Sequence, residues 1–193
     1  AKVLLSEEQI KARIHEMAEI LNKEYADKNP LVVGVLKGVV IFFADMVRQI
    51  DTPCQIDFMW ISSYQGTSTT GSMLVKRDIS VDIKGRHVVI LEDIFDTGNT
   101  INHLVNILLE RGVPREDIKV AVHDYKYFPN KEEQHPNQPD YWCRKFVINN
   151  PEEDRWIHYM SHELVGLSKE ELEEYYYKDD PELRDILGPI LGK

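Results

Sequence analysis

The chain has 193 residues, enough for one domain that buries roughly 70% of the surface exposed by its unfolded form. Its 33 acidic and 23 basic residues give a formal net charge of −10, which argues against a general binder of nucleic acid or membrane surfaces, because such binding depends on clustered lysine and arginine. Cys54 and Cys143 are too few for a disulfide framework or a zinc site, and the chain has no apolar stretch of about 18 residues and no signal-peptide pattern. We therefore expect a soluble cytoplasmic protein that binds neither nucleic acid nor membranes.

Apolar periodicity and turn residues predict helices and strands that alternate along the chain. In chain order, the predicted elements are a helix at 6–26, a strand at 30–36, a helix at 39–50, a strand at 55–64, a polar turn-rich segment at 66–85, a strand at 87–93, a helix at 100–112, a strand at 118–126, an aperiodic loop at 127–140, a strand at 141–148 and a helix at 168–178 with Ser168 as its N-cap. This alternation predicts an α/β fold with a mostly parallel, twisted sheet flanked by helices. No internal repeat or second domain boundary is visible, so we expect residues 1–193 to form a single domain.

The stretch VVILEDIFDTGNT, residues 88–100, has an unusual end for a buried strand: Glu92, Asp93 and Asp96 precede a Thr-Gly-Asn-Thr turn. In open parallel sheets, ligands bind beyond the carboxyl ends of the strands. Backbone N–H groups at a helix start favour phosphate, whereas carboxylates accept hydrogen bonds from sugar hydroxyls and also suit Mg²⁺. The pattern therefore predicts a ribose 5-phosphate site. The alternative is that Asp96 is a helix N-cap beside two solvated acids.

Four segments, in order, resemble the hypoxanthine-guanine branch of the type I phosphoribosyltransferases: KVLLSEEQI, NPLVVGVLKGVVIFFADMVRQIDTP, DFMWISSYQGTSTTG and DIKGRHVVILEDIFDTGNT. The resemblance covers residues 2–126. It implies the type I phosphoribosyltransferase fold, with a core at about 1–126 and a small hood over the purine site, built from the N- and C-terminal segments. The implied activity transfers the phosphoribosyl group of phosphoribosyl diphosphate (PRPP) to hypoxanthine, guanine or xanthine, with Mg²⁺ as cofactor and a homodimer or homotetramer as the assembly.

By position, the resemblance also implies how PRPP is bound. Glu92 and Asp93 would bind the ribose hydroxyls, with or without a bridging Mg²⁺, and Asp96 would be the general base near purine N7. The Leu36-Lys37 peptide would be cis, so that backbone N–H groups turn toward pyrophosphate. The other PRPP-binding positions would be Gly38 beside that peptide, Ser63 and Tyr64 in a mobile loop that closes over the site, Thr97, Gly98, Asn99 and Thr100 in the 5′-phosphate turn, and Lys169 in place of a pyrophosphate-binding arginine.

The acceptor side departs from the family pattern. Lys126 would donate to the 6-oxo group of the purine, which favours 6-oxopurines over adenine because an ammonium group can only donate. Trp156 would stack on the base, Ile157 would offer backbone contacts, and Glu163 would replace the usual metal-binding aspartate. Trp142 is a rival stacking ring.

Other features of the last third have no assigned role. Tyr127 stands where the family usually has proline, the loop at 127–140 is longer than usual, and His158 and His162 have no match in the family pattern. The sequence does not rank hypoxanthine, guanine and xanthine.

Two other functions remain open. A regulatory protein of the same fold could bind PRPP or a nucleotide without catalysis, and a related enzyme could act on adenine or a pyrimidine. Retention of Asp96, Lys126 and the Ser63-Tyr64 pair favours the enzyme, and the acidic charge argues against RNA binding.

Overall fold

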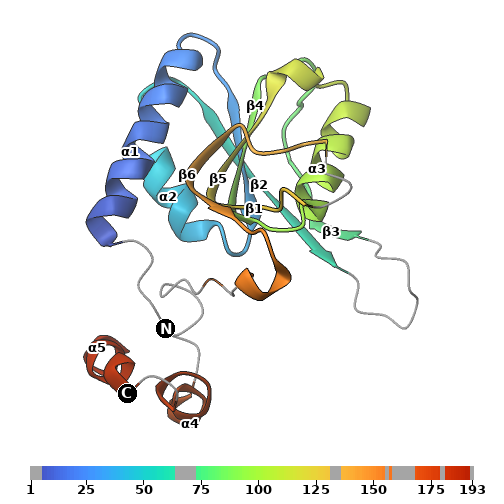
Figure 1. Ribbon diagram of the computed structural model, residues 1–193. Coiled ribbons are helices and arrows are strands. Elements are labelled where there is room, and N and C mark those ends of the chain that lie inside the picture. Colours follow the sequence, from blue (N-terminus) through green and yellow to red (C-terminus); the bar gives the residue numbers. More distant parts are fainter. Residues whose placement is uncertain are drawn as a thin grey trace. The chain divides into compact units, whose positions relative to one another are not determined.

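The computed structural model describes residues 6–63, 73–130, 136–154, 157, 168–178 and 181–191 (Figure 1). The chain divides into two compact units, Glu8–Glu153 and a smaller one that combines Ala1–Glu7 with Asp154–Lys193. The smaller unit thus contains both chain ends. The expectation of one domain with a hood built from both ends stays a prediction.

A six-stranded sheet forms the centre of the larger unit, in the order β3-β2-β1-β4-β5-β6 (Figure 1). Its strands are β1 (Leu31–Leu36), β2 (Gln55–Ser63), β3 (Met73–Arg77), β4 (Val88–Phe95), β5 (Ile118–Tyr127) and β6 (Tyr141–Val147). Five strands run parallel, and β3 pairs antiparallel with β2. The mostly parallel sheet predicted from the alternation of elements is confirmed.

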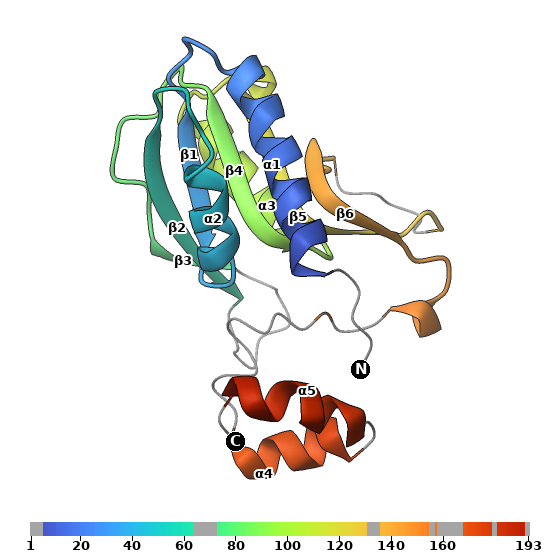
Figure 2. The same ribbon diagram turned by 90° about the vertical axis from the view of Figure 1, so that its left-hand side faces the viewer.

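Helices cover both faces of this sheet, α1 (Glu7–Glu24) and α2 (Val40–Val47) on one side and α3 (Asn99–Glu110) on the other (Figures 1 and 2). Leu104 of α3 is buried in one apolar cluster with Ile90 of β4. Leu21 of α1 and Phe43 of α2 are buried in a second cluster with Val89, the next residue of β4. Each such side chain stabilises the fold by about 1.5–3 kcal/mol. Because both faces are covered, β1 and β4 are almost continuously apolar.

The smaller unit contains α4 (Lys169–Leu172), a following π-helical turn, η4 (Glu173–Tyr177), and α5 (Pro181–Leu191). Leu172 and Tyr177 form its small buried cluster. Ser168 is the N-cap, as predicted: its hydroxyl accepts from the Glu171 backbone N–H at 3.1 Å, and the Glu171 carboxylate accepts from the Ser168 N–H at 2.7 Å.

Three elements differ from the sequence prediction. β3 forms within the segment expected to be turn-rich, because it pairs with β2. β5 continues through Tyr127, which pairs with Val147, since tyrosine keeps the backbone N–H that a proline would lack. α5 was not predicted, because Pro189 lies inside it. No helix in the described part of the chain is long and apolar enough to cross a membrane.

Candidate functional site

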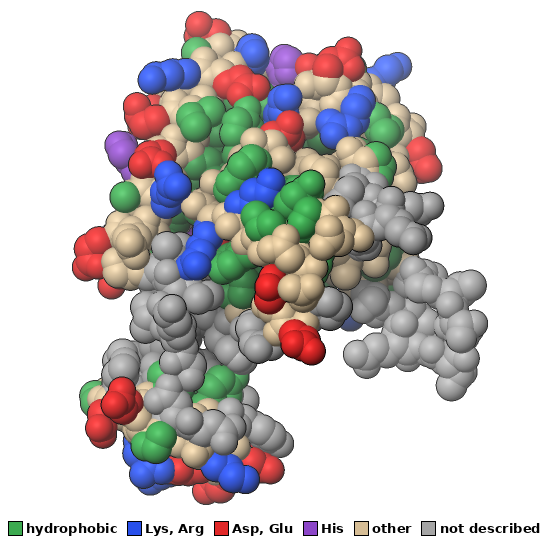
Figure 3. Space-filling view, viewed as in Figure 1, with side chains coloured by type: hydrophobic (Ala, Val, Ile, Leu, Met, Phe, Trp, Pro, Cys, Tyr) green, Lys and Arg blue, Asp and Glu red, His purple; other side chains and the backbone are tan. Residues whose placement is uncertain are grey.

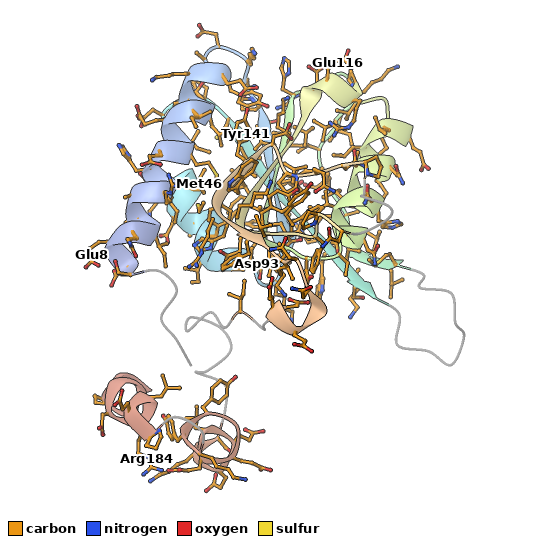
Figure 4. All side chains as sticks on the ribbon, viewed as in Figure 1. Glu8, Met46, Asp93, Glu116, Tyr141 and Arg184 are labelled. Atoms are coloured by element: carbon orange, nitrogen blue, oxygen red, sulfur yellow. The ribbon has the colours of Figure 1, made fainter. Side chains whose placement is uncertain are left out.

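A cavity of about 280 Å³ lies at the carboxyl ends of β1, β2 and β4, in the larger unit. Figure 4 shows Asp93 at the lower end of the sheet in this view, opposite Glu116, which lies in the short 3-10 helix before β5. The cavity is lined by Val35, Leu36, Ile61, Glu92, Asp93, Ile94, Phe95, Asp96, Thr97, Gly98, Thr100 and Ile101. Seven of the residues predicted to bind PRPP are therefore brought together: Leu36, Glu92, Asp93, Asp96, Thr97, Gly98 and Thr100.

The turn between β1 and α2 approaches the end of β4 very closely. The Leu36-Lys37 peptide is cis, as the family resemblance implied. A Cβ atom on Gly38 would lie only 2.0 Å from Oδ2 of Asp93, so only glycine fits this position without a shift. The Lys37 ammonium lies 4.7 Å from the centre of the Trp60 ring, and that of Lys76 lies 4.9 Å from it. Both lysines are thus held by cation–π contacts with one indole.

Two acidic side chains, Glu92 and Asp93, follow the apolar part of β4. Glu92 is 8% exposed. Burial raises the pKa of its carboxyl well above the ordinary value, and the neighbouring Asp93 side chain raises it further. The Asp93 carboxylate accepts from the Ile94 backbone N–H at 2.9 Å, which fixes its orientation. A cation or a set of hydroxyl donors beside these carboxylates would offset the cost of their charge.

The acidic pair also fits a particular kind of metal site. Within the described ranges, no group of three or more His, Cys, Asp or Glu side chains is arranged to hold a metal ion. Mg²⁺ in phosphate-handling sites is usually bound by one or two carboxylates, together with substrate oxygens and water. Glu92 and Asp93 provide that donor set. Glu163, the third predicted ligand, lies outside the described residues.

The turn at the start of α3 has the geometry of an anion site. Gly98 is the N-cap, with φ at +82°, a left-handed conformation that glycine adopts without steric cost. No side chain caps the helix at this position, so the alternative of an N-capping Asp96 is wrong. The predicted position Asn99 is the first residue of α3, and its N–H approaches the Thr97 hydroxyl at 3.5 Å. The backbone N–H groups and the helix dipole at this end favour a phosphate.

Lys126 and Asp96 form an ion pair next to the cavity. The Lys126 side chain is 5% exposed, and its ammonium lies 3.4 Å from Oδ2 of Asp96. The register of β4 and β5 explains the contact, because Phe95 pairs with Tyr125, and Asp96 and Lys126 are the residues that follow this pair. The structure therefore brings together the two residues predicted to face the purine, from positions 30 residues apart.

The remaining predicted residues are not brought to the cavity by the described contacts. Ser63 is the last residue of β2. Tyr64 and Trp156 lie outside the described residues, as do His158 and His162. Ile157 and Lys169 belong to the smaller unit, where Lys169 begins α4.

The rival ring Trp142 lies on β6 and does not line the cavity. It is 42% exposed, and its ring centre is 5.5 Å from that of Tyr125. The Lys145 ammonium lies over the same two rings, 5.4 Å from the centre of Trp142 and 4.9 Å from that of Tyr125. In Figure 3, apolar and basic side chains intermingle in the middle of this face of the larger unit. These contacts give Trp142 a packing role on an edge strand.

Apolar cavity residues were missed by the sequence reasoning. Ile94 and Phe95 lie between the acids of β4, and Ile61 comes from β2. The first two could have been found from their places inside the motif, because a strand that ends in a ligand loop presents alternate side chains to each side. Ile61 has no such local signal.

Residues 1–156 match the family model described as the phosphoribosyl transferase domain. Among curated proteins, a hypoxanthine-guanine phosphoribosyltransferase of Streptococcus pneumoniae is 46% identical over 122 residues, which are 63% of this chain and 67% of that protein. A solved hypoxanthine phosphoribosyltransferase from Staphylococcus aureus is 34% identical with a TM-score of 0.66, covering 76% of this chain and 77% of that one. The Trypanosoma cruzi hypoxanthine phosphoribosyltransferase, solved in complex with the product IMP, is 32% identical with a TM-score of 0.64, covering 76% and 80%.

Proposed function

Because the chain belongs to the type I phosphoribosyltransferase family, in its hypoxanthine-guanine branch, we propose that it is a purine salvage enzyme. It transfers the phosphoribosyl group of PRPP to hypoxanthine, guanine or xanthine, giving the nucleoside 5′-monophosphate and pyrophosphate. One observation supports this more than any other: a single cavity combines two carboxylates, a helix N-terminus and, beside it, the Lys126–Asp96 pair.

The ribose phosphate is bound by the end of β4 and the start of α3. Glu92 and Asp93 accept hydrogen bonds from the two ribose hydroxyls, and the turn from Thr97 to Thr100 binds the 5′-phosphate through its N–H groups and hydroxyls. The β1–α2 turn, with Lys37 and Gly38, contacts the pyrophosphate side. Its close approach to Asp93 keeps both halves of the donor site in one geometry.

The purine is recognised by the Lys126–Asp96 pair. Purine O6 and N7 lie on one edge of the base. The Lys126 ammonium donates to O6, while Asp96 accepts the proton of N7 as general base. Their 3.4 Å separation allows both groups to face that edge. An amino group at purine C6 offers Lys126 no acceptor, so adenine is disfavoured.

Pyrophosphate leaves C1 of the ribose as the purine nitrogen attacks. Glu92 and Asp93 would hold Mg²⁺ here, and the ion would supply charge neutralisation that makes pyrophosphate a better leaving group. The carboxylates that line the cavity stabilise the positive charge that develops on the ribose ring. Ile94, Phe95 and Ile61 give the cavity an apolar wall that limits water near this charge.

The rest of the predicted site belongs to the same proposal. Ser63 and Tyr64 close over the reacting centre, Trp156 stacks on the base, and Ile157 contacts it through its backbone. Glu163 completes the metal site, and Lys169 binds pyrophosphate. These roles rest on the family resemblance alone.

We also propose a cytoplasmic homodimer or homotetramer. Cys54 and Cys143 are free thiols, which suits a reducing compartment. Val40 and Ile41 on α2 are each 47% exposed, and such apolar side chains are typical of surfaces that are covered in an oligomer.

A direct assay tests the activity. The protein is incubated with PRPP, Mg²⁺ and, separately, hypoxanthine, guanine, xanthine and adenine, and the nucleotide formed is measured by chromatography. We expect product with at least one 6-oxopurine and little with adenine. No product with any 6-oxopurine would contradict the proposal, and PRPP binding without product would indicate a regulatory protein.

The variant Asp96→Asn tests the general base. The amide has the same shape but cannot take a proton, so turnover should fall by about 10²–10⁴-fold, with much less effect on PRPP binding measured by calorimetry. Unchanged turnover would refute the assignment.

A further inference from the structure

A chain of three hydrogen bonds joins the long loop between β5 and β6 to the start of α3. Arg115 Nε donates to Oδ1 of Asn137 at 3.0 Å, and Asn137 Nδ2 donates to Oδ1 of Asn102 at 2.7 Å. Asn102 Nδ2 then donates to the Gly98 carbonyl oxygen at 3.0 Å. These hydrogen bonds end on Gly98, the second residue of the phosphate turn and the N-cap of α3.

The groups at the two ends of this series of hydrogen bonds fix the orientation of the Asn137 and Asn102 side-chain amides. A guanidinium can only donate, and a backbone carbonyl can only accept. Asn137 must therefore present its oxygen to Arg115 and its nitrogen to Asn102, and Asn102 must present its nitrogen to Gly98. Asn137 is 6% exposed, so water is poorly placed to replace either bond.

The residues after Asn137 are held against β5 by hydrogen bonds. Gln138 accepts a hydrogen bond from the Tyr125 hydroxyl. The Asp140 N–H donates to the Val120 carbonyl at 2.8 Å, and the Asp140 carboxylate accepts from the Val120 N–H at 2.8 Å. Gln138 and Asp140, which follow Asn137 directly along the chain, are thus fixed to β5.

At the other end, the Gly98 carbonyl accepts two hydrogen bonds from one residue. The Asn102 backbone N–H donates to it at 2.9 Å and the Asn102 side chain at 3.0 Å. Gly98 has its φ at +82° and, with Thr97 and Thr100, lines the cavity. The orientation of the Gly98 peptide sets the direction of the N–H groups that follow it.

We propose that Asn137 is a positioning residue for the 5′-phosphate turn. It holds the Asn102 amide, which in turn holds the Gly98 peptide, so that a loop far along the chain determines the geometry of phosphate recognition. This inference rests on the proposed function, because it assumes that the turn binds the 5′-phosphate of PRPP and of the nucleotide product.

The test compares Asn137→Ala and Asn137→Asp with the wild type. Aspartate keeps the shape and the acceptor for Arg115 but loses the donor to Asn102. Asn130→Ala is the matched control. Asn130 lies in the same loop and donates at 3.0 Å to the Asn149 carbonyl, so it takes no part in the hydrogen bonds that lead to Gly98. Binding of IMP and of inosine, the same ligand without its phosphate, is measured by calorimetry, together with the KM for PRPP, kcat and the melting temperature.

We expect both Asn137 variants to weaken IMP binding and to raise the KM for PRPP by about tenfold, the effect of one lost hydrogen bond in a buried network. Inosine binding should change by less than about twofold, and Asn130→Ala should match the wild type. In an Asn102→Ala background, Asn137→Ala should have little further effect on IMP binding, because both residues act through the same contact.

Two results would overturn the inference: an equal loss of IMP and inosine binding, or a lower melting temperature with an unchanged IMP-to-inosine ratio. Either would mean that Asn137 only satisfies a buried amide. Failure of the wild type to bind IMP or PRPP would instead refute the proposed function. If Asn137→Ala does not fold, the Asn137→Asp comparison decides.

Discussion

Replacement of Gly38 by alanine tests how tightly the β1–α2 turn packs against the end of β4 at Asp93. The added Cβ would lie 2.0 Å from Oδ2, 2.8 Å from Cγ and 3.2 Å from Oδ1 of Asp93, and real Cβ contacts are essentially never shorter than 3.0 Å. The turn or the carboxylate must therefore move by at least 3.0 − 2.0 Å, about 1 Å. Asp93 resists this because its Oδ1 accepts from the Ile94 N–H at 2.9 Å.

A displacement of about 1 Å in a catalytic arrangement costs roughly 10²-fold in rate, or about 2.7 kcal/mol of transition-state stabilisation. We expect Gly38→Ala to lower kcat/KM for PRPP by about that factor, measured by steady-state kinetics with PRPP varied. The melting temperature should change by only a few degrees, because Gly38 lies in a turn and not in either apolar cluster.

The control is Gly85→Ala, at a position with φ at +68° and no atom within 4 Å of the added Cβ. Its strained backbone should cost about 1–2 kcal/mol of stability with no change in kcat/KM. Wild-type kinetics in Gly38→Ala would refute the close approach as a requirement for function. The same profile in both variants would mean that only general stability had changed.

Three further changes have predictable effects. Lys126→Met should lower kcat/KM for the 6-oxopurine by about 100-fold or more, because purine O6 loses the charged donor of the lysine. The KM for PRPP should be nearly unchanged. Equal losses for both substrates would contradict this role of Lys126. Burial would raise the pKa of the Asp57 carboxyl, but hydrogen bonds from Ser80, Phe58 and Arg77 outweigh it and hold that pKa below its ordinary value of 3.8. Asp57→Asn should therefore lower the free energy of unfolding by about 2 kcal/mol at pH 7, measured by denaturant titration. The difference between wild type and variant should shrink as the pH falls below 3.8, because the wild-type carboxylate becomes protonated and its stabilising effect is lost. A difference that does not change with pH would refute this role of Asp57. Burial raises the pKa of the Cys143 thiol to about 12, so mass spectrometry after iodoacetamide treatment at pH 8 should find Cys143 unmodified until denaturant is added; rapid labelling of the native protein would contradict its burial.

The donor half of the site could be predicted because its determinants are adjacent in the sequence. Strand, acids, glycine and helix start follow one another within residues 88–100, and each imposes a local geometry. Glu92, Asp93 and Asp96 line one cavity together with Thr97, Gly98 and Thr100, and their binding roles stay predictions. The matches to known proteins confirm the family resemblance.

Contacts between distant segments were harder to predict. The approach of Gly38 to Asp93 and the contact of Asn137 with Asn102 depend on strand order and loop path, which leave no pattern in a local window. The same applies to β3, whose short apolar run becomes a strand only by pairing with β2. α5 was missed for a different reason, because Gly188 and Pro189 normally end a helix, yet α5 continues to Leu191.

The contact between Lys37 and Trp60 has a practical consequence. An indole that lies 4.7 Å from an ammonium group changes its emission when that charge moves or is neutralised. The chain has three tryptophans, so replacing Trp142 and Trp156 by phenylalanine would leave Trp60 as the single tryptophan, which can be excited selectively. The protein therefore contains a natural optical probe of its β1–α2 turn, suited to following ligand arrival in a stopped-flow instrument without any attached dye.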